Sequence, residues 1–514
     1  MNHDAEIPNR FQAEPDRSPT PQAAPEGRDN VLVLRNTAYL GIAEVLTVPI
    51  SVLLNALLGR FLGPTNLGYV FLATTICAAA TPFVNFGHVG PLPAAVARDR
   101  SSSGRLLGTS LAWRAGAAVV ISGLVAAYAA AAQLPVEQRW AIGLVYLTAT
   151  FLNLTAACQE TIRGFERTDI SAYARVGSQM LAVLVVMPVL VADGSLRGTL
   201  LAQAFSAFVM LLLVLRAARK VGVRHLELSG KVLRMLTREG APFLALEIVL
   251  VLQPNIDAHF LAKLAPSVVV GWYAVAQRLI GFLLIPATAL VGSLYPTLCR
   301  LHATDSDAYG RIVRESIEMV ALVVIPVAVG CGLYPEIGVM IFGRAAYQPA
   351  EDTLRLFSIY LLLVYFSMPI ASALNAAGRQ RAWTAVQMLC VANSLLLDPV
   401  LIDHFQSTTG NGATGLPVAA AISESLMVTA GLLLLPKGVL RRSMLKPLGR
   451  IVAAGGVMLM VAFGLRQLTT LAFVAAPLAG AAYLLALYGS GAIKPEQLLA
   501  VRSFLERRLS RLSR

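Results

Sequence analysis

The sequence predicts an all-α integral membrane protein with about 14 transmembrane helices. Three observations predict this fold class: 56% of the 514 residues are hydrophobic, only 14% are charged, and the mean hydropathy is +0.66. A soluble globular protein carries about 25% charged residues. A helix needs about 20 apolar residues to cross roughly 30 Å of hydrocarbon, and windows of that kind fill almost the whole chain after residue 36.

These windows are expected to be helices rather than barrel strands. Lipid offers no hydrogen-bond partner to a bare backbone, so a spanning segment must be a helix or part of a closed barrel. The windows are too long for barrel strands and lack their two-residue alternation. The expected spans are 37–58, 67–90, 106–130, 140–160, 171–192, 197–217, 242–263, 268–296, 318–341, 354–376, 382–401, 414–435, 447–465 and 469–489.

The positions of lysine and arginine predict the orientation, because positively charged loops stay on the cytoplasmic side. With the N-terminus inside, 32 of the 42 basic residues fall in inner segments, six fall in outer loops and four lie within spans. This split predicts that both termini are cytoplasmic. The net charge of +13 is therefore spread over eight segments that face anionic lipid headgroups, so membrane lipids are expected partners and nucleic acid is not.

The two ends of the chain differ from the spans. The segment 1–34 is expected to be a disordered cytoplasmic tail, because its first 30 residues contain five prolines, six acidic residues and no apolar stretch. Residues 491–514 place Leu498, Leu505 and Leu512 on one helical face with arginines opposite. This amphipathic basic tail is interpreted either as a helix on the inner membrane surface or as a solvated tail.

The sequence offers little for catalysis or for a metal. Its five cysteines are scattered singly, with no CxxC pair and no histidine at ligand spacing, so neither a metal site nor a cofactor is expected. The "DSD" of Asp305–Asp307 mimics acids that hold a metal-bound sugar nucleotide, but it lies in a short inner loop and is interpreted as solvated. No GxxxxGK[ST] phosphate loop is present. An enzyme is therefore not expected.

The first half of the chain resembles the second. At a constant offset of 203, residues 44–70 ("EVLTVPISVLLNALLGRFLGPTNLGYV") align without a gap on residues 247–273 ("EIVLVLQPNIDAHFLAKLAPSVVVGWY"). This register matches Glu44 with Glu247 and Gly68 with Gly271. Both copies start on the same side of the membrane, which predicts two parallel halves of six spans with a substrate site between them.

The stretch "NIDAHFLAKL" followed by "VVVGWYAVAQRLIGFLLIPATALVGSLYPTLCRL" (268–301) resembles the central signature of polysaccharide transporters and O-antigen flippases. These proteins belong to the multidrug/oligosaccharidyl-lipid/polysaccharide (MOP) exporter superfamily. The segments 59–70, 341–360 and 412–424 also resemble the family pattern in the right order, so the resemblance covers about residues 35–445. The matching residues of the signature are Asp257, Gly271, Tyr273, Ala276, Leu279, Tyr295 and Pro296.

The resemblance implies two six-helix lobes around a central cavity, with two additional C-terminal helices. It implies a flippase that moves a lipid-linked oligosaccharide from the inner to the outer leaflet of the bacterial cytoplasmic membrane by alternating access. A polysaccharide polymerase or assembly proteins are candidate partners. The expected divisions are a tail (1–34), an N-terminal lobe (35–217), a basic linker (218–241), a C-terminal lobe (242–436), a helix pair (437–490) and a basic tail (491–514).

Asp257 is the central candidate residue, because a charge in mid-bilayer costs roughly 2.5–3.5 kcal/mol and normally faces a cavity or a partner. Asp257 is expected about 9 Å below the outer boundary and Arg278 near mid-bilayer on the next span, so antiparallel packing can bring them within side-chain reach. Gln253 and Asn255 extend a polar strip around Asp257. Two interpretations stay open. Asp257 and Arg278 form a structural ion pair, or they line a cavity and contact substrate or a coupling ion.

Other charges within spans carry the same pair of interpretations. Glu44, Glu247, Arg114, Arg175 and Glu424 either pair with neighbouring helices or line the cavity. Clustered arginines suit a pyrophosphate-linked headgroup, because guanidinium binds phosphate oxygens bidentately. Carboxylates can couple transport to a proton gradient or hold sodium.

Three alternatives remain. A lipid II flippase and a cation-coupled multidrug exporter belong to the same superfamily, and a membrane glycosyltransferase or polymerase acts on the same lipid-linked substrates. Short outer loops argue against the last of these, because such enzymes usually need a sizeable outer loop or domain.

Overall fold

The computed structural model describes residues 26–468 and 471–492, and within them every regular element is a helix. The apolar windows therefore fold as the hydropathy predicts. The α-helices are α1 (Glu26–Asn85), α2 (Pro91–Arg98), α3 (Ser103–Ala131), α4 (Val136–Gly164), α5 (Thr168–Ala192), α6 (Leu196–Val221), α7 (Gly230–Leu264), α8 (Ser267–Leu283), α9 (Ile285–Thr304), α10 (Ser306–Leu333), α11 (Pro335–Met340), α12 (Arg344–Tyr347), α13 (Ala350–Ala376), α14 (Gln380–Thr409), α15 (Gly415–Leu434), α16 (Leu445–Leu468) and α17 (Ala472–Gly489). Short 3-10 helices cover Arg100–Ser102, Gly412–Thr414 and Arg442–Met444.

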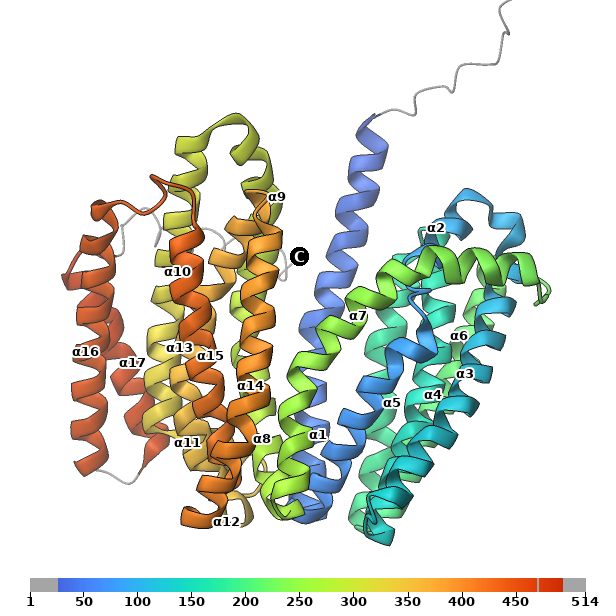
Figure 1. The fold of residues 1–514 in the computed structure, drawn as a ribbon, viewed down its shortest axis with the longest axis horizontal. Helices are drawn as coiled ribbons and strands as arrows, with labels where there is room; N and C mark the ends of the chain where they lie inside the picture. The colour runs from blue at the N-terminus through green and yellow to red at the C-terminus, as the bar shows by residue number, and fades with distance from the viewer. Residues whose placement is uncertain (1–25, 469–470, 493–514) are drawn as a thin grey trace, which may run out of the picture.

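Twelve helical segments of the described chain are long and apolar enough to cross a membrane. One of them, Leu46–Asn85, has 40 residues, about twice the length of a single crossing. Gly63 interrupts it with φ 73° and ψ 171°, where two helices meet at a kink. Figure 1 shows α1 reversing direction along its length. This reversal separates the first two expected spans. The number fourteen stays a prediction, because α7 is not among the twelve.

The helices form two bundles, which we call the N-terminal lobe (α1–α6) and the C-terminal lobe (α8–α15). Figure 1 shows them meeting at one end and diverging toward the other, with α7 crossing between them. A single apolar core joins both lobes where they meet, and it includes Leu67, Val145, Tyr273 and Phe342. Where they diverge, each lobe has its own core, centred on Leu107 and Ile162 in one and on Trp383 in the other.

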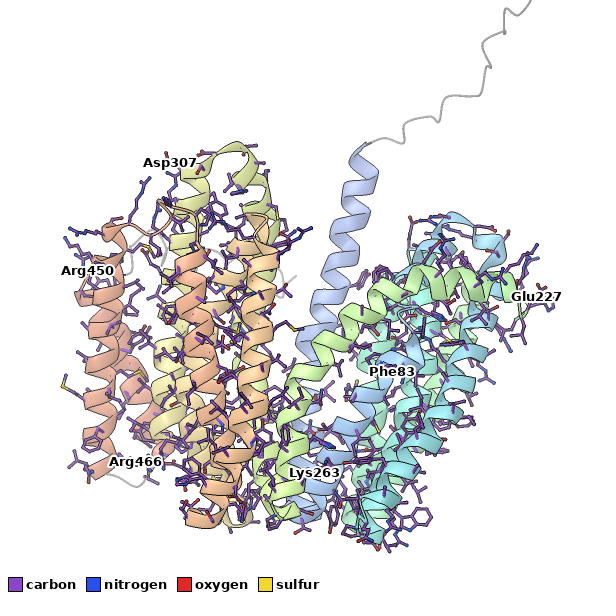
Figure 2. All side chains as sticks on the ribbon, viewed as in Figure 1. Phe83, Glu227, Lys263, Asp307, Arg450 and Arg466 are labelled. Carbon is purple, nitrogen blue, oxygen red and sulfur yellow. The ribbon has the colours of Figure 1, made fainter. Side chains whose placement is uncertain are left out.

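The ends of the molecule correspond to the two sides of the predicted topology. Glu227, Asp307 and Arg450, from segments predicted to be cytoplasmic, lie toward the diverging end in Figure 2, which we call the inner end. Lys263 and Arg466, from predicted outer loops, lie at the opposite, outer end. α1 begins at Glu26, so residues 26–34 of the predicted tail are helical. The basic segment 493–514 and residues 1–25 lie outside the described residues.

The lobes cross at two glycines that the internal repeat matches to each other. A Cβ on Gly68 would lie 2.0 Å from the carbonyl oxygen of Ser267, and a Cβ on Gly271 would lie 1.9 Å from that of Pro64. The repeat offset of 203 matches Gly68 with Gly271 and Pro64 with Ser267, so the two contacts are equivalent. Such a reciprocal contact is what two related copies make across a two-fold axis, so the crossing supports the register of the repeat.

The last two helices cover one flank of the C-terminal lobe. α16 and α17 pack on α10 through Tyr334, Met458 and Tyr483. The Tyr334 hydroxyl donates a hydrogen bond to the carbonyl of Ala462 at 2.7 Å, and that of Tyr483 donates to Leu322 at 3.0 Å. These bonds satisfy phenol groups that lipid could not.

Candidate functional site

Asp257 lies against a second carboxyl group rather than against a base. α7 carries Asp257 to α14, where the carboxyl of Asp398 lies within hydrogen-bonding range of it. Asp398 is 1% exposed, and its Oδ2 accepts no hydrogen bond from any N–H or O–H of the described residues. Two carboxyl groups at this range repel each other unless a proton or a cation lies between them.

Asp257 lines a cavity of about 480 Å³ inside the C-terminal lobe. Helices α7, α8, α13, α14 and α15 form its wall, and its polar lining residues are Asp257, Tyr273, Gln277, Tyr360, Ser367, Gln387, Ser394, Ser423 and Glu424. The cavity is mixed in character, because Phe357, Trp383 and Met427 also line it. A cavity with a few convergent polar groups is typical of a binding site.

Glu424 forms the second acidic point of this cavity. It is 7% exposed, and the hydroxyl of Ser367 donates a hydrogen bond to it. The neighbouring Ser423 hydroxyl accepts a hydrogen bond from the Asn393 amide at 2.9 Å. The phenol of Tyr360 lines the same cavity and lies within electrostatic range of both Glu424 and Asp257.

Arg278 does not pair with Asp257. Its Nη1 is buried without a hydrogen-bond partner, and within the part of the chain described here the guanidinium forms no ion pair. Tyr347 lies in its electrostatic range, and the Tyr347 hydroxyl donates to the carbonyl of Gly59 across the lobes at 2.9 Å. Arg278 is thus an uncompensated cation close to the junction of the lobes.

The predicted charges of the N-terminal lobe include a buried ion pair. Arg114 on α3 and Glu160 on α4 are 0% and 4% exposed at the side chain and lie 2.6 Å apart. Arg114 also donates to the carbonyl of Asn153 at 2.8 Å. Glu247 on α7 lies within electrostatic range of both, with a buried Oε2 that has no hydrogen-bond partner. These three residues form a separate cluster from Asp257.

Asn255 lies apart from both clusters. Asn255 donates to the carbonyl of Val251 on its own helix at 2.6 Å and lines an apolar cavity of about 400 Å³ with Tyr128 and His259. Arg175 is exposed on α5. The side chains of Glu44 and Gln253 lie outside the described part of the structure.

Asp398 is the residue that the sequence interpretation missed. It lies in the expected span 382–401, within the apolar run "SLLLDPVL", where a carboxylate is as costly as at Asp257. The same argument that selected Asp257 selects Asp398. Its pairing with Asp257 could not be read from the sequence, because nothing in the local pattern specifies which helices pack together.

The "DSD" loop has ordinary structural partners. The Asp305 carboxylate accepts a hydrogen bond from the backbone N–H of Ala308 at 2.9 Å and so caps α10. Asp307 forms an exposed ion pair with Arg441 at 2.6 Å. Neither contact resembles a metal-binding arrangement, and no cluster of three metal-ligating side chains occurs among the described residues.

Comparison with known proteins supports the resemblance seen in the sequence. A family model described as "Polysaccharide biosynthesis protein" matches residues 33–302, which is more than half of the chain. A protein named probable flippase AglR from Haloferax volcanii is 24% identical over 211 residues, which cover 40% of this chain and 43% of that protein. The chain thus spans less than half the length of this curated relative.

Solved structures share the fold at low sequence identity. The lipid II flippase MurJ in an inward closed conformation matches with a TM-score of 0.69 and 13% identity, covering 90% of this chain and 99% of that one. An inward-facing multidrug resistance MATE family transporter of the MOP superfamily matches with a TM-score of 0.60 and 14% identity, covering 77% and 96%. These matches identify a MurJ- and MATE-like fold.

Proposed function

The chain belongs to the polysaccharide biosynthesis protein family, and from this premise we propose that it is a flippase of the MOP superfamily that moves a lipid-linked oligosaccharide from the inner to the outer leaflet. The membrane is the bacterial cytoplasmic membrane, with both termini in the cytoplasm. Two observations support the proposal together: the lobes share an apolar core at the outer end, and a carboxyl-lined cavity lies beside that junction. Each polar sugar group left unsatisfied in hydrocarbon costs several kcal/mol, so a carrier is required.

The observation that carries the mechanism is the paired carboxyls of Asp257 and Asp398. A buried Asp398 oxygen without a donor needs either a proton or a cation to balance it. We assign this pair to energy coupling, with a proton or sodium ion as the species that binds and leaves. Loading changes the charge between α7 and α14, which is a local event that can bias the lobes between two arrangements.

Arg278 is the proposed contact for the anionic headgroup. Its Nη1 is buried without a hydrogen-bond partner among the described residues, whereas Arg114 is neutralised by Glu160. An unpaired guanidinium near the junction of the lobes fits a diphosphate group, which it can bind through two parallel hydrogen bonds.

A cation-coupled multidrug exporter is the second candidate, and the cavity itself favours it. Asp257 and Glu424 line a space that also contains Tyr360, Phe357 and Trp383, and such a mixture of acids and aromatic rings suits an organic cation. The two functions place the substrate differently. A drug cation would occupy the C-terminal cavity, whereas a diphosphate-linked oligosaccharide would contact Arg278.

The central test is Asp257→Asn in cells that carry the variant as the only copy. Loss of the charge should abolish export of surface polysaccharide while the protein level in the membrane stays normal. Asp403→Asn is the matched control, because Asp403 is exposed on the same helix as Asp398 and is expected to leave export unchanged. Normal export by a normally expressed Asp257→Asn variant would eliminate the coupling role.

A deletion strain separates the two candidate substrates. For a flippase, the lipid extract should accumulate a lipid-linked oligosaccharide in the inner leaflet while surface polysaccharide is lost, and mass analysis would identify it. Increased sensitivity to cationic dyes without such accumulation would instead support the drug exporter.

A further inference from the structure

Two adjoining cavities on the N-terminal lobe together have the shape and polarity of a membrane lipid. The first is a polar cavity of about 350 Å³ at the inner end, between the start of α3 and the segment that links α6 to α7. The second is an apolar groove of about 680 Å³ that continues along α3 from the first. We propose that they form one binding site for an anionic phospholipid of the inner leaflet, with its phosphate in the polar cavity and one acyl chain in the groove.

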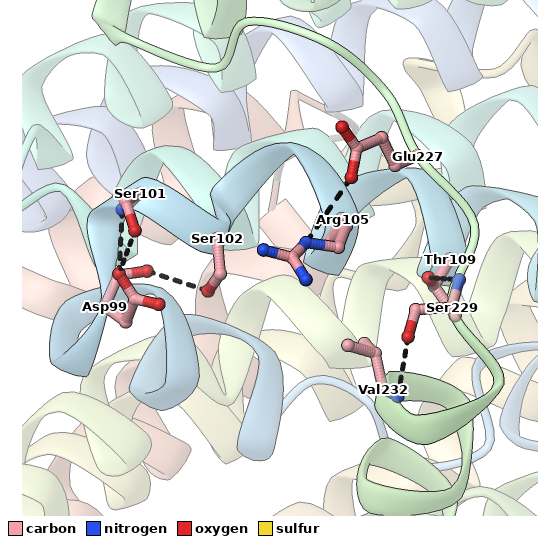
Figure 3. A network of polar contacts seen from close by, with 8 residues as sticks. All are labelled: Asp99, Ser101, Ser102, Arg105, Thr109, Glu227, Ser229 and Val232. Carbon is pink, nitrogen blue, oxygen red and sulfur yellow. Dashed lines mark hydrogen bonds and ion pairs between the residues drawn. The ribbon is translucent and has the colours of Figure 1, made fainter.

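The linking segment is held against α3 by two glycines one helical turn apart. A Cβ on Gly104 would lie 2.0 Å from the carbonyl oxygen of His225, and one on Gly108 would lie 2.6 Å from that of Glu227. The four-residue spacing puts both glycines on one face of α3. The backbone N–H of Ser229 then donates to the Thr109 hydroxyl at 3.1 Å, as Figure 3 shows. The linking segment is therefore a fixed wall of both cavities.

The polar cavity carries more positive than negative charge. Its charged walls are Arg100, Arg105 and Arg224 against Glu227, with His225 beside them. Glu227 pairs with Arg105 at 3.4 Å, and Arg100 pairs with Glu166 outside the wall at 3.0 Å. Arg224 has no ion-pair partner among the described residues. This balance attracts a phosphate, because arginine matches phosphate oxygens with parallel donors.

Asp99 does not neutralise the polar cavity, since it is not part of its wall and is occupied locally. Its carboxylate accepts hydrogen bonds from the hydroxyl and the backbone N–H of Ser101, at 2.6 and 3.0 Å. The Ser101 hydroxyl bond is the main cause that holds the pKa of Asp99 below its usual range. Asp99 therefore stays charged, fixes the turn before α3, and leaves Arg224 available.

The change from polar to apolar occurs at the same level on both walls. On α3 the polar cavity ends at Arg105 and the groove begins at Thr109, while on the linking segment it ends at Glu227 and the groove begins at Leu228. The groove then follows α3 to Ile121, a rise of about 18 Å at 1.5 Å per residue. One leaflet of hydrocarbon is roughly 15 Å deep, so the groove matches one acyl chain.

The groove contains a natural reporter. Trp113 lines it and is fixed by an edge contact with Phe86, with ring centroids 5.4 Å apart. An acyl chain in the groove would lie against this indole. A brominated chain quenches tryptophan fluorescence on contact, so quenching of Trp113 reports occupancy of this site rather than of the whole membrane surface.

The experiment uses the full chain reconstituted in phosphatidylcholine vesicles that contain a titrated fraction of brominated phosphatidylglycerol or brominated phosphatidylcholine. The fluorescence of Trp113 is obtained by subtracting the fluorescence of the Trp113→Phe variant from that of the native chain. Brominated phosphatidylglycerol should reach half-maximal quenching at about a tenfold lower mole fraction than brominated phosphatidylcholine. Equal quenching by the two lipids would overturn the anionic headgroup site.

Two variants test the two parts of the site separately. Arg105→Gln combined with Arg224→Gln should abolish the tenfold preference, whereas Arg311→Gln, at an exposed position on the inner end of the other lobe, should keep it. Gly116→Leu should remove most of the quenching by either lipid, because a Cβ at Gly116 projects into the open groove. Gly143→Leu is its control, since a Cβ there also meets nothing within 4 Å but lies on α4.

The remaining outcomes also decide the proposal. Quenching that persists in Gly116→Leu at the native level would show that the chain lies elsewhere and would overturn the groove. Free glycerol 1-phosphate should not relieve quenching at millimolar concentration. If it relieves quenching as effectively as unbrominated phosphatidylglycerol does, the acyl chain contributes no binding and the proposed lipid site is overturned.

Discussion

The two lobes bury charge in opposite ways. In the N-terminal lobe, Arg114 and Glu160 compensate each other at 2.6 Å. Where α7 packs against the C-terminal lobe, Asp257 and Asp398 meet without a basic partner among the described residues. A buried ion pair fixes two helices once, whereas a pair of carboxyls changes its interaction with every proton or cation that binds. The first arrangement suits a scaffold and the second suits a switch.

The internal repeat allows equivalent positions of the two lobes to be compared. At the offset of 203, Asp257 occupies the position that Leu54 has in the first copy. Leu54 packs against the core that joins the lobes, while Asp257 lines the C-terminal cavity. The aligned helices thus differ at this position by an apolar and an acidic residue, while the crossing at Gly68 and Gly271 stays reciprocal.

The largest expected effect is on stability. Glu160→Gln leaves Arg114 buried without its counter-charge and should destabilise the protein by about 3–5 kcal/mol. Asp398→Asn should change stability by less than about 1 kcal/mol. In the native pair one carboxyl must be protonated to donate a hydrogen bond to the other, and the introduced amide can donate that bond to Asp257 instead. The measurement is the thermal unfolding midpoint in detergent.

The control for this pair is an exposed ion pair of the same lobe. Arg197 and Glu137 lie 2.7 Å apart with about half of each side chain exposed, so Arg197→Gln should cost about 0.2–1 kcal/mol. The contrast between the lobes fails if Glu160→Gln is no more costly than Arg197→Gln, or if Asp398→Asn destabilises as much as Glu160→Gln.

The next effect concerns the symmetry of the crossing. Gly68→Ala and Gly271→Ala each place a methyl group against a carbonyl oxygen of the other lobe, and overpacking of this kind typically costs about 1–3 kcal/mol. Because the contacts are reciprocal, the two variants should lower the unfolding midpoint and the export rate to similar extents. Gly143→Ala, where a Cβ meets nothing within 4 Å and which lies on α4 away from the C-terminal cavity, should have little effect. A large loss in one variant only would argue against the two-fold relation.

Sequence reasoning predicted the helical class well because hydrocarbon leaves the backbone no alternative to helices, and the repeat register followed from Glu44, Gly68 and their counterparts. It could not predict which charges meet. Arg114 and Glu160 occupy separate spans, and so do Asp257 and Asp398, and periodicity fixes the face of a residue but not its neighbour. It also placed Asp257 and Arg278 as potential partners from depth alone, whereas packing directs them to different surroundings.

The smallest expected effect lies at the outer end, where the lobes are held by polar bonds. Arg60 donates from Nε to the carbonyl of Ile341 at 2.8 Å and from Nη2 to that of Met340 at 3.2 Å. The side chain is exposed, so Arg60→Gln should cost about 1 kcal/mol of lobe contact, a roughly fivefold shift in population. Spin labels at the exposed Thr65 and Ala345 would measure it as a longer distance component.

Arg139→Gln is the matched control, because it distinguishes the loss of a bond between the lobes from the loss of an arginine hydrogen bond in general. Arg139 donates to the carbonyl of Leu134 at 2.7 Å within the N-terminal lobe, so Arg139→Gln removes a similar bond without touching the junction. The exposed Cys299 is replaced by serine to keep labelling specific. If Arg60→Gln and Arg139→Gln leave the same distance distribution, the outer end is held by the glycine crossing, the shared core and the bond from Tyr347 to Gly59 without help from Arg60. A broader distribution only in Arg60→Gln would instead make this bond one that must break for the lobes to separate at the outer end.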